Sequence, residues 1–265
     1  SMRANRKKIV LWKRDRVDVL PLISNAPYSV GQIADYAFTS RKKASQRAYK
    51  YFCEKLVHRI SSPSANPQGR SEYLYWISKK GLSVISSIKE GRVQYKLNNV
   101  RQWSAARLDH QLHVNNFHIS THLYCQKKNK IDYTFHHSSR QFKGFKKASL
   151  IPDGVLVLRH IRLSKRLLHC IEIDLGSESE YGYNPSSIKC KLEKYLNYYD
   201  SGDSGNDFPG TKGFRVLLVT TDNIRAKNIS DLAYEIEADF VLTTPMNALK
   251  NREIFNEVWY QPGKD

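Results

Sequence analysis

Two segments, "LIPDGVLVL" at residues 150–158 and "LLHCIEIDL" at residues 167–175, each combine a run of apolar residues with carboxylates. Short apolar runs that end at Gly, Pro or Ser are typical of buried strands. Asp153 lies at the start of the first run, and Glu172 and Asp174 lie near the end of the second. Side chains two residues apart in a strand point to the same face, so these three carboxylates are candidate metal ligands.

The segments around these two runs alternate between β and α patterns. This alternation predicts a compact α+β or α/β unit with a mixed sheet flanked by helices. The Gly-, Ser- and Asp-rich stretch 200–213 predicts a long exposed loop. The further strands are expected at 131–139, 213–221 and 239–245, and the helices at 186–202 and 228–237.

Charge divides the chain into two unequal parts. Residues 1–150 hold 29 lysines and arginines against 8 acids, a net charge of +21, whereas residues 151–265 hold 14 against 17, a net charge of −3. These balances agree with the total of +18. A basic excess concentrated in one half of a chain indicates a polyanionic partner, and nucleic acid is the first expectation.

The basic half has the element order of a winged helix-turn-helix. Its third helix would enter the major groove, and a hairpin would contact the DNA backbone. We predict a winged-helix DNA-binding domain over residues 1–100 and a second domain over 101–265. The helices are expected at 16–24, 29–38 with Ser29 as N-cap, 40–60 and 79–88, and a strand at 71–78, after the turn-rich stretch 61–70. The candidate DNA-binding residues on the third helix are Arg41, Lys42, Lys43, Arg47 and Lys50.

Composition narrows the class of protein further. Four scattered cysteines form no CxxC pair, which favours a reduced cytoplasmic protein with no structural zinc. No apolar run approaches the length of a membrane span, so no membrane insertion is expected. The basic start of the chain is not followed by the apolar region of a signal peptide.

A long helix is predicted over 104–127, and it carries four histidines. His118 and His122 are four residues apart, but the glutamate of an HExxH zinc motif is absent, which argues against a zinc site. His110 lies in the first half of this helix. A helix that positions DNA or donates one polar group to a nearby site is the favoured interpretation.

In order and spacing, the motifs "DHQLHVNNF", "IPDGVLVL", "CIEIDLGSES" and "KCKLEKYLNYY" resemble a known family. They are similar to the plasmid replication-relaxation family and the MOBC-type mobilization relaxases, over roughly residues 16–245. The "PDG" and "EID" pair also resembles the PD-(D/E)xK nuclease core of restriction endonucleases. The resemblance implies a DNA-nicking enzyme that acts at a plasmid transfer or replication origin.

This likeness implies a metal site and a catalytic cation. Mg²⁺ or Mn²⁺ takes oxygen ligands, which Asp153 and Glu172 would supply from adjacent strands, with Asp174 as a further ligand. Asp174 occupies the position where the motif has its lysine, so the cation must come from elsewhere. Helix geometry places Lys189 and Lys191 on opposite flanks of the buried stripe and does not choose between them. The family's recurrent Lys-Leu-x-x-Tyr favours Lys191, and His110 is the fallback candidate.

Two alternatives remain open. A histidine–tyrosine relaxase would need a metal-binding histidine pair and a tyrosine nucleophile. His136 and His137 point to opposite strand faces, while Tyr181 and Tyr183 lie in the loop after the acidic strand. The second alternative is a non-catalytic, origin-binding or regulatory winged-helix protein whose nuclease-like domain is structural. The expected partners are double-stranded origin DNA, single-stranded DNA after nicking, and conjugation accessory or coupling proteins.

Overall fold

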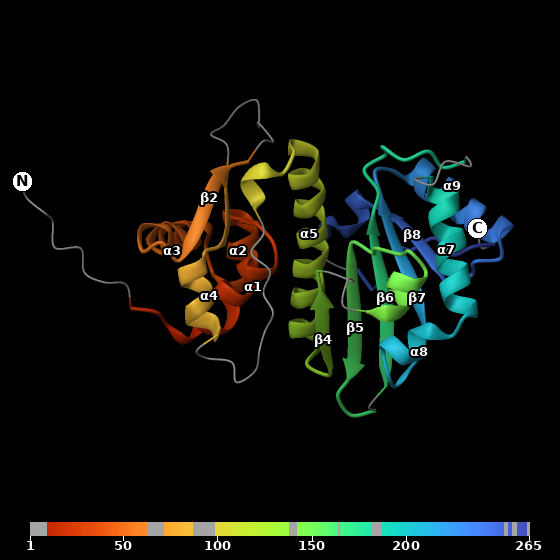
Figure 1. The fold of residues 1–265 in the computed structure, drawn as a ribbon, viewed down its shortest axis with the longest axis horizontal. Helices are drawn as coiled ribbons and strands as arrows, with labels where there is room; N and C mark the ends of the chain where they lie inside the picture. Colours follow the sequence, from red (N-terminus) through yellow and green to blue (C-terminus); the bar gives the residue numbers. More distant parts are fainter. Residues whose placement is uncertain are drawn as a thin grey trace, which may run out of the picture. The chain divides into compact units, whose positions relative to one another are not determined.

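The computed structural model describes residues 10–62, 72–86, 99–137, 142–163, 165–181, 187–251, 254–255 and 259–263. The chain divides into two compact units, Ser1–Ile119 and Ser120–Asp265 (Figure 1). Both contain helices and a sheet, so the protein is of the mixed α and β class that we predicted.

The first unit consists of short helices and a three-stranded antiparallel sheet with strand order β1-β3-β2. The buried side chains of the helices and of β3 form its interior, with Leu20, Ile33 and Ala48 almost completely inaccessible. In chain order the elements are η1 (Asp15–Val19), α1 (Leu20–Asn25), β1 (Tyr28–Ser29), α2 (Val30–Ala37), α3 (Arg41–Cys53), β2 (Val57–Ser61), β3 (Tyr73–Ile77), α4 (Lys79–Ser86), η2 (Val100–Gln102) and the first part of α5 (Ala105–Lys128).

Helix α2 begins at the residue that the sequence indicated. The Ser29 side chain accepts a hydrogen bond from the Gln32 amide while the Gln32 side chain accepts one from the Ser29 amide. This reciprocal capping box satisfies two amides that the first helical turn leaves without partners. The prediction that Ser29 is the N-cap is confirmed.

The third helix is shorter than predicted. We expected it to continue to residue 60, but α3 ends at Cys53. Lys55 adopts a left-handed backbone conformation with φ of 58°, and the Leu56 amide donates to the Tyr51 carbonyl at 2.9 Å. This is the hydrogen-bond pattern of a Schellman C-cap, which closes the helix. The chain then continues as β2, which pairs antiparallel with β3 from Val57 opposite Ile77 onward.

The boundary between the two compact units lies after Ile119, within α5, rather than after residue 100 as predicted. Polar contacts hold the first part of α5 to the first unit. Gln32 Nε2 donates to the Leu112 carbonyl at 2.8 Å, and Asn115 Nδ2 donates to the Pro27 carbonyl at 2.7 Å. These contacts are consistent with a first unit that continues to Ile119.

The second unit contains a mixed five-stranded sheet with strand order β4-β5-β6-β7-β8. The pairs β4–β5 and β5–β6 are antiparallel, and β6–β7 and β7–β8 are parallel. The short helices α6 and α8 were not predicted, and α8 lies inside the expected loop 200–213. In chain order the elements are β4 (Ile131–His136), α6 (Lys143–Lys147), β5 (Gly154–His160), β6 (Arg166–Ile173), α7 (Ile188–Asp200), α8 (Asp203–Asp207), β7 (Thr211–Thr220), α9 (Asn223–Glu235), β8 (Val241–Pro245) and η3 (Met246–Asn251).

Helices α7 and α9 lie together along the same side of this sheet (Figure 1). Apolar side chains of β6, β7 and β8 pack with both helices in one continuous core. On α7 the buried stripe runs through Ile188, Leu192, Tyr195 and Tyr198, whereas Tyr199, four residues after Tyr195, is 43% exposed. The packing orients α7 so that one flank of the helix faces the end of β6.

Candidate functional site

The structure brings Asp153 and Glu172 next to each other. Gly154 pairs with Ile171 across antiparallel strands β5 and β6, so the next residues outward, Asp153 and Glu172, are opposite each other. The Ile173 amide donates to Asp153 Oδ2 at 2.8 Å, which fixes the aspartate at the end of β6. A Cβ at Gly154 would come within 2.6 Å of the Phe135 ring, so a larger residue here would require that ring to move.

Glu172 is a buried carboxylate with two donors. The Tyr195 hydroxyl donates to its Oε1 at 2.6 Å, and the Lys191 ammonium lies 3.3 Å from its Oε2. Only 3% of Glu172 is exposed. Burial raises the pKa of Glu172 to about 7, because the loss of hydration outweighs the stabilising charge of Lys191, and the nearby charge of Asp153 raises it further.

Helix α7 places Lys191 against the end of β6. The Lys191 ammonium contacts Glu172 and also lies 3.0 Å from Glu178 Oε2. Burial alone would lower the pKa of Lys191, but the surrounding carboxylates outweigh it and raise the pKa. Lys189 is partly buried at the first turn of the same helix, where its backbone amide donates to the Glu180 carbonyl.

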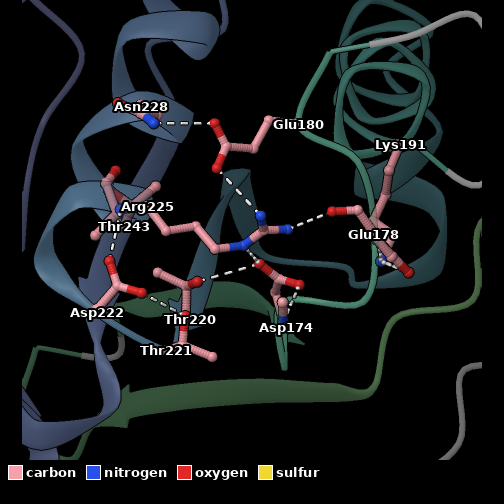
Figure 2. A network of polar contacts seen from close by, with 12 residues as sticks. Asp174, Glu178, Glu180, Lys191, Thr220, Thr221, Asp222, Arg225, Asn228 and Thr243 are labelled. Atoms are coloured by element: carbon pink, nitrogen blue, oxygen red, sulfur yellow. Dashed lines mark hydrogen bonds and ion pairs between the residues drawn. The ribbon is translucent and has the colours of Figure 1, made fainter.

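Asp174, which we predicted as a further metal ligand, contacts Arg225, Thr220 and the Gly176 amide. Strand β6 ends at Ile173, so the alternation that would align Asp174 with Glu172 ends there. The Asp174 carboxylate instead forms an ion pair with the Arg225 guanidinium and accepts a hydrogen bond from the Thr220 hydroxyl at 3.1 Å (Figure 2). With donors on both oxygens, including the Gly176 amide, Asp174 anchors the chain after β6.

Arg225, at the start of α9, is the centre of a network that sequence reasoning missed (Figure 2). Besides Asp174, its guanidinium contacts Glu180 Oε1 at 3.1 Å and the Glu178 carbonyl at 2.5 Å. Asn228 Nδ2 donates to the other Glu180 oxygen at 3.1 Å. The acidic run "ESE" at 178–180 was visible in the sequence, but its cationic partner lies 45 residues away from Glu180.

The residues present fit a divalent cation held by two protein carboxylates. Mg²⁺ is usually bound by one or two carboxylates, with water and substrate phosphate oxygens as its remaining ligands. Asp153 and Glu172 supply such a pair. Among the described residues, no group of three or more histidines, cysteines, aspartates or glutamates is arranged to hold a metal.

On α3 the predicted basic residues separate into two groups. Arg41, Lys42, Lys43 and Lys50 are exposed, and Arg41 forms an ion pair with Glu72 at 2.9 Å. Gln46, which sequence reasoning did not single out, is also exposed, three residues after Lys43 and four before Lys50.

Arg47 was assigned wrongly to the exposed basic face. It is 7% exposed and forms an ion pair with the buried Asp15, and its guanidinium lies 4.2 Å from the centre of the Trp12 ring. Arg47 is four residues after Lys43, which suggested that it lies on the exposed basic face. The buried face of α3, however, contains Ala44 and Ala48, and Arg47 is buried together with them.

Two histidines of α5 contact tyrosine hydroxyls. His118 Nδ1 is 3.0 Å from the Tyr28 hydroxyl, and His122 Nδ1 is 3.0 Å from the Tyr133 hydroxyl. His110 belongs to the first unit, whereas Asp153, Glu172 and Lys191 belong to the second.

Tyr181 is 53% exposed after the acidic run, and Tyr183 lies outside the described residues. In the part of the chain that the structure describes, no helix has the length and apolar character needed to cross a membrane.

Comparison with known protein families decides the identity of the chain at family level. A model of the replication-relaxation family matches residues 24–211, which is more than half of the sequence. The chain belongs to the replication-relaxation family. Membership indicates a role in plasmid replication or relaxation and therefore an interaction with DNA. Searches of curated proteins and of solved structures gave no match.

The match to the replication-relaxation family includes both parts of the candidate machinery. It begins at residue 24, before α2, and continues beyond α7 to the start of β7. The exposed lysines of α3 and the Asp153, Glu172 and Lys191 cluster therefore lie inside the matched region. Arg225, on α9, lies outside it.

Proposed function

We propose that this member of the replication-relaxation family is a metal-dependent DNA-nicking protein, of the MOBC relaxase type, that acts at a plasmid origin. The observation that carries the proposal is the placement of Lys191 against Glu172, with Asp153 on the neighbouring strand. Two carboxylates and a cation at the end of a mixed sheet fit the composition of a PD-(D/E)xK nuclease site. The lysine comes from α7 in place of the position that Asp174 occupies.

Each residue then has a distinct role. Asp153 and Glu172 would hold Mg²⁺ or Mn²⁺, and the bound ion would activate a water molecule and neutralise charge on the phosphoryl oxygens. The Ile173 amide and the Tyr195 hydroxyl orient the two carboxylates. Lys191 would stabilise the negative charge that develops at phosphorus, as positioned cations do in phosphoryl transfer.

The first unit would bind duplex DNA as a winged helix-turn-helix. Three consecutive helices followed by the β2–β3 hairpin support this proposal, since the third helix of such a fold enters the major groove. Lys42, Lys43 and Lys50 on α3 would contact phosphates, and the exposed amide of Gln46 has the donor and acceptor needed to read adenine. Two separate units would thus divide recognition and chemistry between them.

Incubation of the purified protein with supercoiled plasmid carrying its own origin tests the proposal. We expect conversion to the open circular form with Mg²⁺ or Mn²⁺ and none with EDTA. Denaturing gels of the products would show whether protein remains attached to the cut strand. Plasmid that stays supercoiled with either metal would refute nicking as the function.

The second candidate is a non-catalytic origin-binding protein. The observation in its favour is that Glu172 already has a tyrosine and a lysine as partners and is almost inaccessible, as a structural carboxylate would be. Under this alternative the chain would bind origin DNA with the same affinity in Mg²⁺ and in EDTA, and no metal would bind to the second unit.

A further inference from the structure

The Lys191 ammonium lies between two carboxylates of different character. Glu172 Oε2 is 3.3 Å away and belongs to a side chain that is only 5% exposed, at the end of β6. Glu178 Oε2 is 3.0 Å away and belongs to a side chain that is 31% exposed, on the loop between β6 and α7. One contact comes from the sheet and the other from the loop.

The loop that carries Glu178 is tied to α9. Arg225 binds the Asp174 carboxylate at one end of this stretch and the Glu180 carboxylate at the other, and it also binds the Glu178 carbonyl between them (Figure 2). Asp222 caps α9 by accepting from the Arg225 amide at 2.9 Å, which fixes the helix turn that presents the guanidinium. Arg225 therefore determines where the Glu178 backbone lies.

We propose that Glu178 is a positioning residue for Lys191, and that Arg225 holds Glu178 in place for this task. The proposal rests on the function proposed above. A divalent cation on Glu172 would withdraw that carboxylate from the lysine and would also repel the ammonium. Glu178 contacts the same ammonium from the loop and is not one of the proposed metal ligands, so it would keep Lys191 in the site when the metal is bound.

The first test is Glu178→Gln, which keeps the shape of the side chain and removes its charge. In single-turnover nicking with saturating DNA and metal, we expect the rate to fall about tenfold to a hundredfold, less than for removal of a direct donor to the transition state. DNA affinity should not change. The matched control is Glu193→Gln, which removes the same charge from an exposed position on α7 and should nick at the wild-type rate.

A double-mutant cycle separates positioning from general structural damage. If Glu178 acts through Lys191, then Glu178→Gln should cause no further loss of rate in a Lys191→Ala background, because coupled residues are not additive. A fully additive loss would overturn the proposal. Arg225→Lys should reproduce the Glu178→Gln defect, since an ammonium cannot contact Asp174, Glu180 and a carbonyl at once.

A metal-free measurement keeps the proposal testable without nicking. In EDTA, acetylation of Lys191 by acetic anhydride, quantified by mass spectrometry against Lys194, should be several-fold faster in Glu178→Gln and in Arg225→Lys. An unchanged acetylation ratio would show that Glu178 does not hold the lysine. If the wild-type chain fails to nick DNA, the proposed function is refuted, and the acetylation result still decides whether Glu178 positions Lys191.

Discussion

The guanidinium of Arg47, on α3, forms a buried ion pair with the Asp15 carboxylate of η1, and the Tyr51 hydroxyl donates to the same carboxylate. The Arg47 side chain is 8% exposed and the Asp15 side chain is completely buried. This pair joins the first described helix of the chain to the helix that carries the DNA-binding candidates. It makes Arg47 part of the interior of the first unit.

Arg47→Ala should therefore destabilise the first unit. Removal of one partner from a buried ion pair leaves an uncompensated charge, which typically costs about 3–5 kcal/mol. Urea unfolding followed by circular dichroism measures this loss. Lys43→Ala, on an exposed position of the same helix, should change stability by less than about 0.5 kcal/mol. Equal stability of the two variants would contradict the buried role of Arg47.

The exposed lysines of α3 should contribute electrostatic affinity for DNA. Removing one lysine–phosphate interaction should reduce the slope of log affinity against log salt by about 0.9, so Lys42→Ala, Lys43→Ala and Lys50→Ala together should flatten it by about 2.7. Fluorescence anisotropy with a labelled origin duplex measures the slope. Gln46→Ala is the uncharged comparison and should lower the preference for origin over random DNA at an unchanged slope. A triple variant with the wild-type slope would rule out α3 as the DNA-contacting helix.

The two neighbouring carboxylates should be needed for metal binding but not for DNA binding. Asp153→Asn and Glu172→Gln should each abolish nicking and the heat of Mn²⁺ binding in titration calorimetry, because each removes an anionic oxygen ligand. Asp132→Asn, an exposed carboxylate of the same sheet, should keep both properties. Wild-type nicking by either site variant would refute the metal site.

Alanine substitutions of Lys191 and of Lys189 should differ sharply in their effect on the nicking rate. Loss of a donor that stabilises transition-state charge typically costs about 10²–10³ in rate, so Lys191→Ala should slow nicking at least about a hundredfold with unaltered DNA affinity. Lys189→Ala should cost much less, since the contacts to Glu172 and Glu178 belong to Lys191. The reverse order of the two variants would mean that α7 turns the other lysine toward the reacting phosphate.

Metal binding should depend on pH near neutrality. Because burial raises the pKa of Glu172 to about 7, the folded protein holds this proton between the ordinary carboxyl range and about pH 7, where the unfolded chain has lost it. A raised carboxyl pKa makes the metal-free fold less stable as pH rises through this window, and Mn²⁺ must displace the proton below about pH 7.

Mn²⁺ affinity measured across a pH series on both sides of neutrality should therefore rise and level off above about pH 7, with proton release on binding at the acidic end. Tyr195→Phe should move the rise to higher pH, because it removes a hydrogen bond that favours the ionised carboxylate. Affinity that is flat across this range would show that Glu172 is ionised throughout.

The local features of this protein can be predicted from neighbouring residues in the sequence. The basic first half, the Ser29 cap of α2, the apolar runs of β5 and β6 and the periodicity of α7 all follow from neighbouring residues, because caps and alternation depend on short-range geometry. The same patterns predicted that Asp153 and Glu172 would lie on adjacent strands, since each stands at a defined place in a buried run. The motif order also indicated the replication-relaxation family, which the family match confirms.

The contact partners of the charged side chains depend on how the chain packs and could not be predicted from local sequence. Asp174 has the spacing of a metal ligand, but β6 ends one residue before it, and Arg225, 51 residues away in the chain, takes its carboxylate. Arg47 has the spacing of a DNA contact, but Asp15 binds it in the interior. Helix geometry alone does not distinguish Lys189 from Lys191. The packing of α7 on the sheet brings Lys191 into contact with Glu172. Burial and ion pairing join residues that are far apart in the chain. Local spacing therefore cannot predict which distant charged residue a side chain will pair with.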